Sequence, residues 1–402
     1  MTVSASDIIS VLRSRKNVLL YGPPGTGKTH LMNEVARSLV AEAEAGAAGT
    51  AIVINTSTEA APLEEKSISS IAKRWVTFHQ GYSYEDFVIG MRPAPDGKSV
   101  LSLKPRAGVL LELAAEVSNG VDEGLLLIDE INRGNASRIF GEFITLLEDD
   151  KRLDSDGSET DTTIPVSLPY LEATETFEIP TSMGAYEQGS VFRMPSKVYT
   201  LASMNSVDKS VAPLDTALRR RFHIINLYPS FDDLRRAVGL PSGDTVRLVP
   251  RSEIVLTREA VARLAVHVVE KLNRGIGLYM GPEFCLGQWY LARLASPKLD
   301  GEGASAAAAD IWNYSILPQL IELFHGRNDQ LVALLEIDRL GGYAGMTVMK
   351  PEGEEEDLGG VTYVQTEPAA ADAVLDYLAK FAEAPPEPVV DIPPAAAAVP
   401  GD

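Results

Sequence analysis

The sequence predicts an α/β fold in which a parallel β-sheet is flanked by helices and followed by a mainly helical domain. Three observations support this prediction. Short apolar runs alternate with helical periodicity up to about residue 227, a glycine-rich turn joins one such run to a helix, and the pattern after Pro229 is mostly helical. With 402 residues and 45% hydrophobic content, the chain is long enough to bury the cores of two or three domains.

The spacing of apolar residues predicts the individual elements. A short helix over 7–16 precedes an apolar strand at 18–21, and helical spacing then runs from Leu31 to Leu39. Further strands are expected at 51–55, 75–79, 125–129, 198–204 and 223–227. Helical stretches lie between most of them, and such alternation is typical of a parallel sheet covered by helices.

Two segments interrupt this alternation. The Asp96-Gly97 turn within residues 91–105 predicts a β-hairpin inserted next to a helix. The polar stretch 151–163 leads into residues 165–169, where a second hairpin or a mobile loop is expected.

Three parts of the chain are therefore expected. Residues 1–230 form the α/β domain, residues 231–345 form an α-helical domain, and residues 346–402 form an acidic, Pro/Ala-rich tail that is largely disordered. Residues 351–402 alone carry 12 acidic side chains and one basic side chain. One amphipathic stretch in the tail, with Val374, Leu375, Leu378 and Phe381, is able to dock as a helix.

Composition excludes several classes of protein. The net charge of −20 argues against a chain that binds nucleic acid or an anionic membrane through its average surface. One cysteine, Cys285, excludes an internal disulfide and any multi-cysteine metal site. Since the N-terminus lacks signal-peptide features and no apolar run approaches 18 residues, we expect a cytoplasmic protein that does not enter a membrane.

The segment that begins at Gly22 satisfies the pattern G-x-x-x-x-G-K-[ST], with a strand before it and a helix after it. Its backbone N–H groups are expected to surround the β-phosphate of a nucleotide, Lys28 to reach the β- and γ-phosphates, and the Thr29 hydroxyl to bind Mg²⁺. The nucleotide-binding candidates are Gly22, Pro23, Pro24, Gly25, Thr26, Gly27, Lys28, Thr29 and His30.

Polar residues end two of the predicted strands. Asp129 and Glu130 follow an apolar strand at the sheet edge where ligands bind in such folds, so Asp129 is expected to hold Mg²⁺ and Glu130 to orient the attacking water. Asn205 ends the next strand of the sheet, where its side chain is able to touch the γ-phosphate or the water. A single Asn at a strand end is more often a turn former, so this assignment depends on the other two motifs.

Arg219, Arg220 and Arg221 form a dense basic cluster in an acidic protein. They could be a solvated helix end, or they could offer an arginine to the γ-phosphate bound by a neighbouring subunit. We favour the second interpretation, because three adjacent guanidinium groups repel one another unless an anion is nearby.

These motifs together resemble an AAA+ ATPase, of the branch with a helix-2 insert that is related to dynein and MoxR. Intervening segments narrow the resemblance to the McrB-type motor subunits of modification-dependent restriction systems. The matching segments are Phe78-His79-Gln80-Gly81-Tyr82-Ser83-Tyr84-Glu85-Asp86-Phe87, Asp129-Glu130-Ile131-Asn132-Arg133, Met204-Asn205-Ser206-Val207-Asp208-Lys209-Ser210 and Ala217-Leu218-Arg219-Arg220-Arg221-Phe222.

The resemblance implies a ring-forming homo-oligomer, a hexamer, that hydrolyses GTP or ATP with Mg²⁺ and works with a separate McrC-like nuclease subunit in restriction or antiviral defence. It implies that Asn205 and Asp208 belong to a signature loop that positions the water or a partner subunit. It also implies that the three arginines supply a trans arginine and a sensor, and that the 91–105 hairpin faces a pore where DNA is contacted.

Three departures from the family pattern limit what carries over. Lys209 replaces an arginine, Gln288-Trp289 replaces His-Ser, and the chain starts almost at the first strand, so we expect no N-terminal domain that reads modified cytosine. The choice between GTP and ATP stays open. Two alternatives also stay open, a MoxR-like ATP-dependent remodelling chaperone and a nucleotide-switched scaffold.

Overall fold

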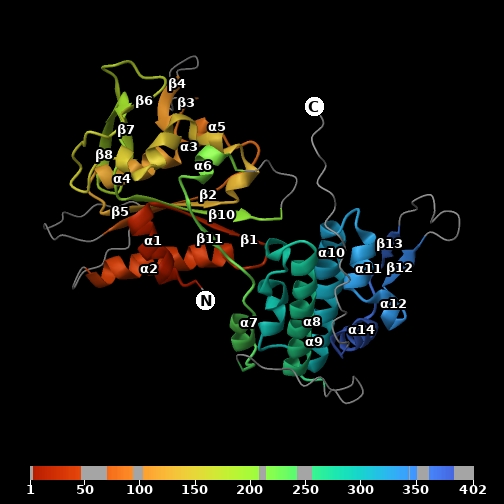
Figure 1. The fold of residues 1–402 in the computed structure, drawn as a ribbon. Coiled ribbons are helices and arrows are strands. Elements are labelled where there is room, and N and C mark those ends of the chain that lie inside the picture. The colour runs from red at the N-terminus through yellow and green to blue at the C-terminus, as the bar shows by residue number, and fades with distance from the viewer. Residues whose placement is uncertain are drawn as a thin grey trace, which may run out of the picture. The chain divides into compact units, whose positions relative to one another are not determined.

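The computed structural model describes residues 3–46, 70–93, 103–207, 214–241, 256–343, 345–350 and 362–383. The chain divides into two compact units, Met1–Pro229 and Ser230–Asp402, and Figure 1 labels their elements. Each unit has its own layers of secondary structure, and each is described by itself.

The first unit is built on a five-stranded parallel sheet with the strand order β11-β1-β10-β5-β2. Its strands are β1 (Asn17–Gly22), β2 (Ile71–Thr77), β5 (Glu123–Asp129), β10 (Val198–Asn205) and β11 (His223–Asn226). The predicted α/β class is confirmed. The strand expected at 51–55 lies outside the described residues.

Helices cover both faces of this sheet (Figure 1). On one face α1 (Ala5–Arg15) and α2 (Lys28–Gly46) pack on Leu125 and Leu127 of β5, whereas α3 (Tyr84–Phe87), α4 (Val109–Ser118) and α5 (Ala136–Phe140) lie on the side of Leu126 and Ile128. Successive strand residues point to opposite faces, so β5 needs apolar side chains at every position. A strand buried on both faces therefore reads as one continuous apolar run in the sequence.

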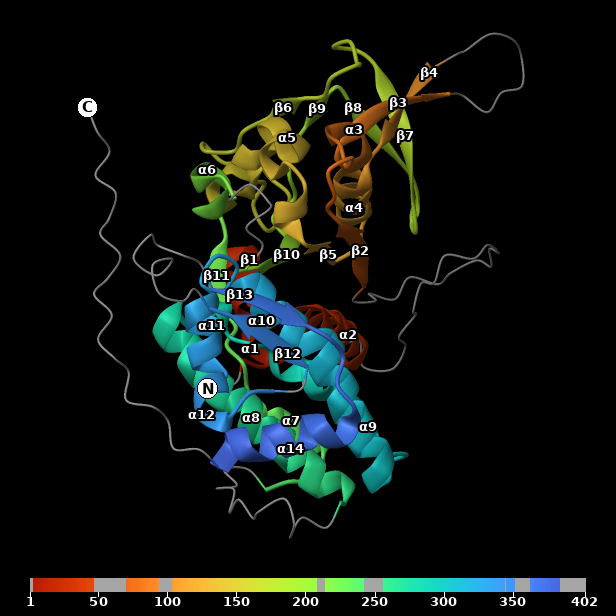
Figure 2. The ribbon, with the colours of Figure 1, turned by 90° about the vertical axis from the view of Figure 1, so that its right-hand side faces the viewer.

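Two hairpins stand beside the helices of the first unit. The predicted hairpin at 91–105 is confirmed as β3 (Ile89–Pro93) paired with β4 (Leu103–Ala107), although its Asp96-Gly97 turn lies outside the described residues. Figure 2 shows it next to a second hairpin, β7 (Thr176–Thr181) with β8 (Gly184–Gly189).

The structure differs from the sequence prediction around residues 165–169. Those residues do not fold back on themselves. Instead β6 (Val166–Ser167) pairs with β9 (Val191–Phe192), so the β7–β8 hairpin lies between the two paired strands in the sequence. The remaining short helices of the unit are η1 (Ile131–Arg133), η2 (Gly141–Leu147), η3 (Asp149–Lys151) and α6 (Thr216–Arg219).

The second unit is mainly helical, as the sequence predicts. Its longest helix is α8 (Arg258–Tyr279), which begins at an N-cap threonine, Thr257. The other helices are α7 (Phe231–Ala237), η5 (Pro282–Phe284), η6 (Gln288–Ala295), α9 (Gly301–Ile311), the π-helix η7 (Trp312–Ile316), α10 (Leu317–Leu323), α11 (Asn328–Leu334) and α12 (Ile337–Leu340).

The expectation of a largely disordered tail over 346–402 needs a correction over its described residues, 346–350 and 362–383. Strands β12 (Met346–Met349) and β13 (Tyr363–Thr366) form an antiparallel pair, and α14 (Ala371–Glu383) packs on α8 and α9. The helix buries its apolar face, including Val374, Leu375, Leu378 and Phe381. The acidic composition misled the prediction, because the charges of α14 lie on the side away from this buried face.

Candidate functional site

The glycine-rich loop lies between the end of β1 and the start of α2, as its motif requires. A side chain at Gly22 would place its Cβ 2.2 Å from the Leu227 carbonyl oxygen, so only glycine fits there. Gly25 and Gly27 have φ angles of +77° and +89°, which residues with side chains rarely adopt. The loop is therefore a backbone cradle at a helix N-terminus, the geometry that binds phosphate in other proteins.

The two polar side chains of the motif point in different directions. Lys28 is buried, and its Nζ donates hydrogen bonds of 2.9 Å to the carbonyl oxygens of Gly22 and Pro23. Thr29 is exposed, and its hydroxyl donates to Asp129 Oδ2 at 3.3 Å. His30 is also exposed, on the first turn of α2. A hydroxyl and a carboxylate from distant parts of the chain thus meet at one point, and both are oxygen donors of the kind Mg²⁺ prefers.

Asp129 and Glu130 are fixed from the neighbouring strand β10. The Ser203 hydroxyl donates to Asp129 Oδ1 and accepts from the Glu130 backbone N–H at 3.1 Å. Asn205 Nδ2 donates to Glu130 Oε1 at 2.7 Å, and Arg133 Nε lies 3.3 Å from Glu130 Oε2. The Glu130 backbone has a φ of +55°, an uncommon conformation that turns its side chain at the end of the strand.

These contacts bring together most of the predicted site residues. Gly22 of β1 is paired in register with Asn205 of β10, so the phosphate loop and the polar strand ends share one edge of the sheet. Asp208 lies outside the described residues. The sequence reasoning missed Ser203, whose hydroxyl holds both carboxylate residues. A serine near the end of a mainly apolar strand, two residues before Asn205, was the available signal.

The three arginines of the cluster have different surroundings. The Arg219 guanidinium lies 5.8 Å from the centre of the Tyr21 ring, on the strand that leads into the phosphate loop. Arg220 is exposed. Arg221 turns inward, where it forms an ion pair with Glu148 at 2.6 Å and donates to the Ala217 carbonyl oxygen at 2.8 Å. The cluster is therefore not one uniform basic surface.

A cavity of about 440 Å³ lies beside Arg220 and Arg221. Its lining includes Arg15, Asp149, Arg220, Arg221 and His223. Arg15 ends α1 just before β1, and His223 is the first residue of β11. The cavity is thus at the edge of the sheet where the strands begin, opposite the edge that carries the phosphate loop.

The described residues lack two features. Among them, no helix combines the length and apolar character needed to cross a membrane. Within the same residues, no group of three or more His, Cys, Asp or Glu side chains is arranged to hold a metal ion.

Comparison with known proteins gives two matches to family models. Residues 17–222 match the AAA domain of the dynein-related subfamily. Residues 264–332 match the α-helical lid domain of McrB.

Two curated relatives are similar over a little more than half of the chain. The McrB subunit of the Escherichia coli K12 type IV methyl-directed restriction enzyme EcoKMcrB is 32% identical over 226 residues, 56% of this chain and 38% of that protein. The Bacillus subtilis 168 protein YdiS, a component of the type II restriction enzyme BsuMI, is 27% identical over 252 residues, 57% of this chain and 62% of that protein. The chain thus spans less than two thirds of either relative.

A crystal structure from Cytophaga hutchinsonii aligns with 82% of this chain and 79% of its own at 13% identity and a TM-score of 0.32, and at that score it supports no argument. The family matches agree with the site geometry, because the AAA match begins at β1 and ends just after the three arginines. The chain belongs to the dynein-related subfamily of the AAA family and carries an α-helical lid of the McrB type.

Proposed function

We propose that this chain is a nucleoside-triphosphate hydrolase that assembles into a ring and drives a restriction or anti-phage defence complex together with a separate, McrC-like nuclease subunit. The observation that carries the enzymatic part is the chain of contacts from Thr29 through Asp129 and Ser203 to Glu130 and Asn205. The names of the two curated relatives, both restriction-enzyme components, support the biological part.

The binding roles follow from the loop. Its backbone N–H groups, from the residues of 22–30 other than Pro23 and Pro24, hold the phosphates of GTP or ATP at the N-terminus of α2. Lys28 exchanges its two carbonyl acceptors for phosphate oxygens, which carry full negative charge and are stronger acceptors. Thr29 and Asp129, whose oxygens are 3.3 Å apart, hold Mg²⁺, which neutralises charge on the β- and γ-phosphates when bound.

The hydrolytic role belongs to Glu130. Its carboxylate orients a water molecule toward the γ-phosphorus and accepts a proton from it. The new P–O bond forms as the bond to the β–γ bridging oxygen breaks, and inorganic phosphate and nucleoside diphosphate leave. Asn205 donates to one carboxylate oxygen, so the side chain keeps one orientation while the other oxygen contacts the water.

The arrangement of the arginines supports a ring. Arg220 lines the cavity where the strands begin, and the phosphate loop lies where β1 ends. Six residues of strand separate these points by roughly 17 Å at about 3.3 Å per residue, too far for Arg220 to reach its own γ-phosphate. We assign Arg220 as the arginine offered to the next subunit of a hexamer, and Arg219, beside Tyr21, as the sensor of the subunit's own nucleotide.

Two further parts of the proposal rest on family membership. The β3–β4 hairpin faces the pore of the ring and contacts DNA there, and Asp208 joins Asn205 in the loop that meets the partner subunit. The proposal leaves recognition of a modified base to another polypeptide.

The experiment compares Glu130→Gln with the wild type. We expect phosphate release from GTP or ATP to fall on the order of 10²–10⁴-fold, since the variant cannot accept the proton of the water. Binding of fluorescent GTP and ATP analogues should be retained, and should be lost in Lys28→Ala. The matched control, Glu34→Gln, changes an exposed carboxylate on α2 and should leave turnover unchanged. Normal turnover by Glu130→Gln with either nucleotide would contradict the proposal.

A further inference from the structure

Arg221 differs from its two neighbours in that its charge is matched within the chain. Its side chain is 10% exposed, against 33% for its partner Glu148, and a 2.6 Å contact joins Arg221 Nη2 to Glu148 Oε1. Arg221 Nη1 donates to the Ala217 carbonyl oxygen one helical turn earlier. A guanidinium held in this way has a structural role, and it is not available to bind the phosphate of another subunit.

The position of Glu148 is fixed in turn, because Arg152 holds the backbone of the two residues that precede Glu148. Arg152, buried to 2% exposure, donates from Nε to the Leu146 carbonyl oxygen at 2.7 Å and from Nη2 to the Leu147 carbonyl oxygen at 3.3 Å. Its Nη1 donates to the Val198 carbonyl oxygen of β10 at 2.5 Å. The backbone immediately before Glu148 is thus attached to the central sheet, and it cannot shift without breaking these hydrogen bonds.

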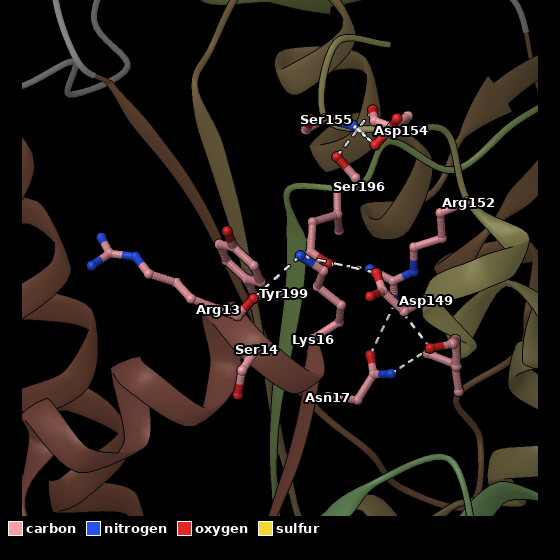
Figure 3. Close-up of polar contacts among 12 residues, drawn as sticks. Arg13, Ser14, Lys16, Asn17, Asp149, Arg152, Asp154, Ser155, Ser196 and Tyr199 are labelled. Atoms are coloured by element: carbon pink, nitrogen blue, oxygen red, sulfur yellow. Dashed lines mark hydrogen bonds and ion pairs between the residues drawn. The ribbon is translucent and has the colours of Figure 1, made fainter. Parts of the chain in front are cut away.

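One side chain links this attachment to the arginine cluster. Asn17, the first residue of β1, is 1% exposed, and Figure 3 shows it close to Arg152. Its Oδ1 accepts from Arg152 Nη2 at 3.1 Å. Its Nδ2 donates to the carbonyl oxygens of both Leu147 and Arg221, at 2.6 and 3.3 Å. The backbone of Arg221 and the segment that carries Glu148 therefore share one anchor.

Arg220 lies between Arg221 and Arg219 in the sequence, and it is exposed. Its backbone N–H is bonded to the Thr216 carbonyl oxygen, and that of Arg221 to the Leu218 carbonyl oxygen, so the two residues belong to one rigid turn. Glu148 removes the repulsion that an unpaired Arg221 would exert on Arg220. When the position of a reacting or charge-stabilising group changes by about 1 Å, the rate can fall by about 10²-fold, so a fixed turn matters for catalysis.

We propose that Glu148 is a positioning residue for hydrolysis in the neighbouring subunit: by pairing with Arg221 it holds the turn from which Arg220 reaches the next subunit's γ-phosphate. Arg221 is therefore the inner support of the cluster. This inference rests on the proposed ring NTPase, and it adds that the effect of Glu148 appears in a neighbour's site while its own site remains intact.

The test separates a subunit's own site from the arginine it offers. Subunits carrying Glu130→Gln bind nucleotide without hydrolysing it, so in mixed rings all turnover comes from wild-type subunits. Wild-type protein is mixed with an excess of either Glu130→Gln or the double variant Glu130→Gln/Glu148→Ala, and phosphate release per wild-type subunit is measured over a series of nucleotide concentrations up to saturation. We expect turnover in the second mixture to be lower by a factor of about ten or more, with KM little changed.

The controls separate positioning from folding. Glu130→Gln/Glu159→Ala removes another ion pair of the first unit, that with Arg193, and should behave like Glu130→Gln alone. The triple variant Glu130→Gln/Glu148→Arg/Arg221→Glu exchanges the charges of the ion pair. It should restore much of the turnover that Glu148→Ala removes.

Equal turnover in the two mixtures would overturn the inference, as would failure of the Glu148→Ala subunits to enter the ring. Both results leave the proposed hydrolase intact, provided that wild-type protein alone turns over. No turnover by the wild type would overturn the proposed function and the inference together.

Discussion

Arg152 carries a positive charge in the interior of the first unit, and no carboxylate in the described part of the chain is bonded to it. Burial lowers the pKa of Arg152 to about 10, so the guanidinium stays protonated at neutral pH. Its charge is stabilised by the carbonyl oxygens of Leu146, Leu147 and Val198 and by the Asn17 side chain. The sequence did not predict this role, because Arg152 lies within the polar stretch 151–163 and its acceptors lie up to 135 residues away.

Replacing Arg152 tests the role. In Arg152→Met several buried acceptors lose their donor, at a cost of about 1–3 kcal/mol each, so we expect the free energy of unfolding to fall by about 3 kcal/mol or more. Lysine should not rescue the loss, since an ammonium group cannot reproduce the planar fork of donors. Urea denaturation measures the effect, with Lys151→Met as a surface control expected to change stability by about 0.5 kcal/mol or less. A small effect of Arg152→Met would show that the network does not hold this region.

At the scale of elements, local signals were predictable and long-range pairings were not. The phosphate loop between β1 and α2 and the hairpin β3–β4 each follow from a short pattern of glycine, lysine or Asp-Gly. The pairing of β6 with β9 joins residues about 25 positions apart, and no local pattern specifies it. Ser203 and Glu148 are similar cases, because each acts on residues that only the folded sheet brings near.

A histidine on α8, His267, makes the stability of the second unit depend on pH. Burial, followed by the positive charges of Arg274 and Lys271, lowers the pKa of His267 on α8 from its usual value of 6.5. Lys271 Nζ, on the same helix, donates to the Phe381 carbonyl oxygen of α14 at 2.6 Å. Burial and these positive charges therefore favour a neutral His267, although the Ala382 backbone of α14 favours the protonated form.

The sign of the effect follows from linkage. Below pH 6.5 the unfolded chain binds a proton at this histidine before the folded chain does, so acid destabilises the fold, whereas the contribution is fully present above pH 6.5. In His267→Gln this loss should disappear. We expect the urea midpoint of the wild type to fall more between pH 7.5 and 5.5 than that of the variant. Parallel changes in the two proteins would refute the assignment.

At the scale of the whole molecule, the site is distributed over two edges of one sheet. The phosphate loop, Asp129, Glu130 and Asn205 share the edge where the strands end, whereas Arg220, Arg221 and Glu148 surround a cavity where they begin. Under the proposed function, a single chain therefore holds both halves of a catalytic site without joining them. A head-to-tail ring would join them, because each interface brings one edge of a subunit to the opposite edge of the next.

The net charge of −20 describes the chain as a whole and says little about either edge. The sequence singled out the phosphate loop, Asp129, Glu130, Asn205 and the three arginines from their motifs, but not Glu148. It could not show that Arg219, Arg220 and Arg221 have separate roles, because three adjacent arginines look equivalent until Tyr21 and Glu148 are seen beside the first and the third.

Complementation between two inactive variants tests the central claim most directly. Glu130→Gln lacks the residue that activates water but keeps Arg220, and Arg220→Ala keeps Glu130 but offers no arginine to its neighbour. Each protein alone should hydrolyse GTP or ATP on the order of 10²-fold more slowly than the wild type or worse. An equal mixture should regain activity, because about a quarter of randomly formed head-to-tail interfaces pair an intact Glu130 with an intact Arg220. A mixture that stays as inactive as its components would contradict a catalytic site shared between subunits.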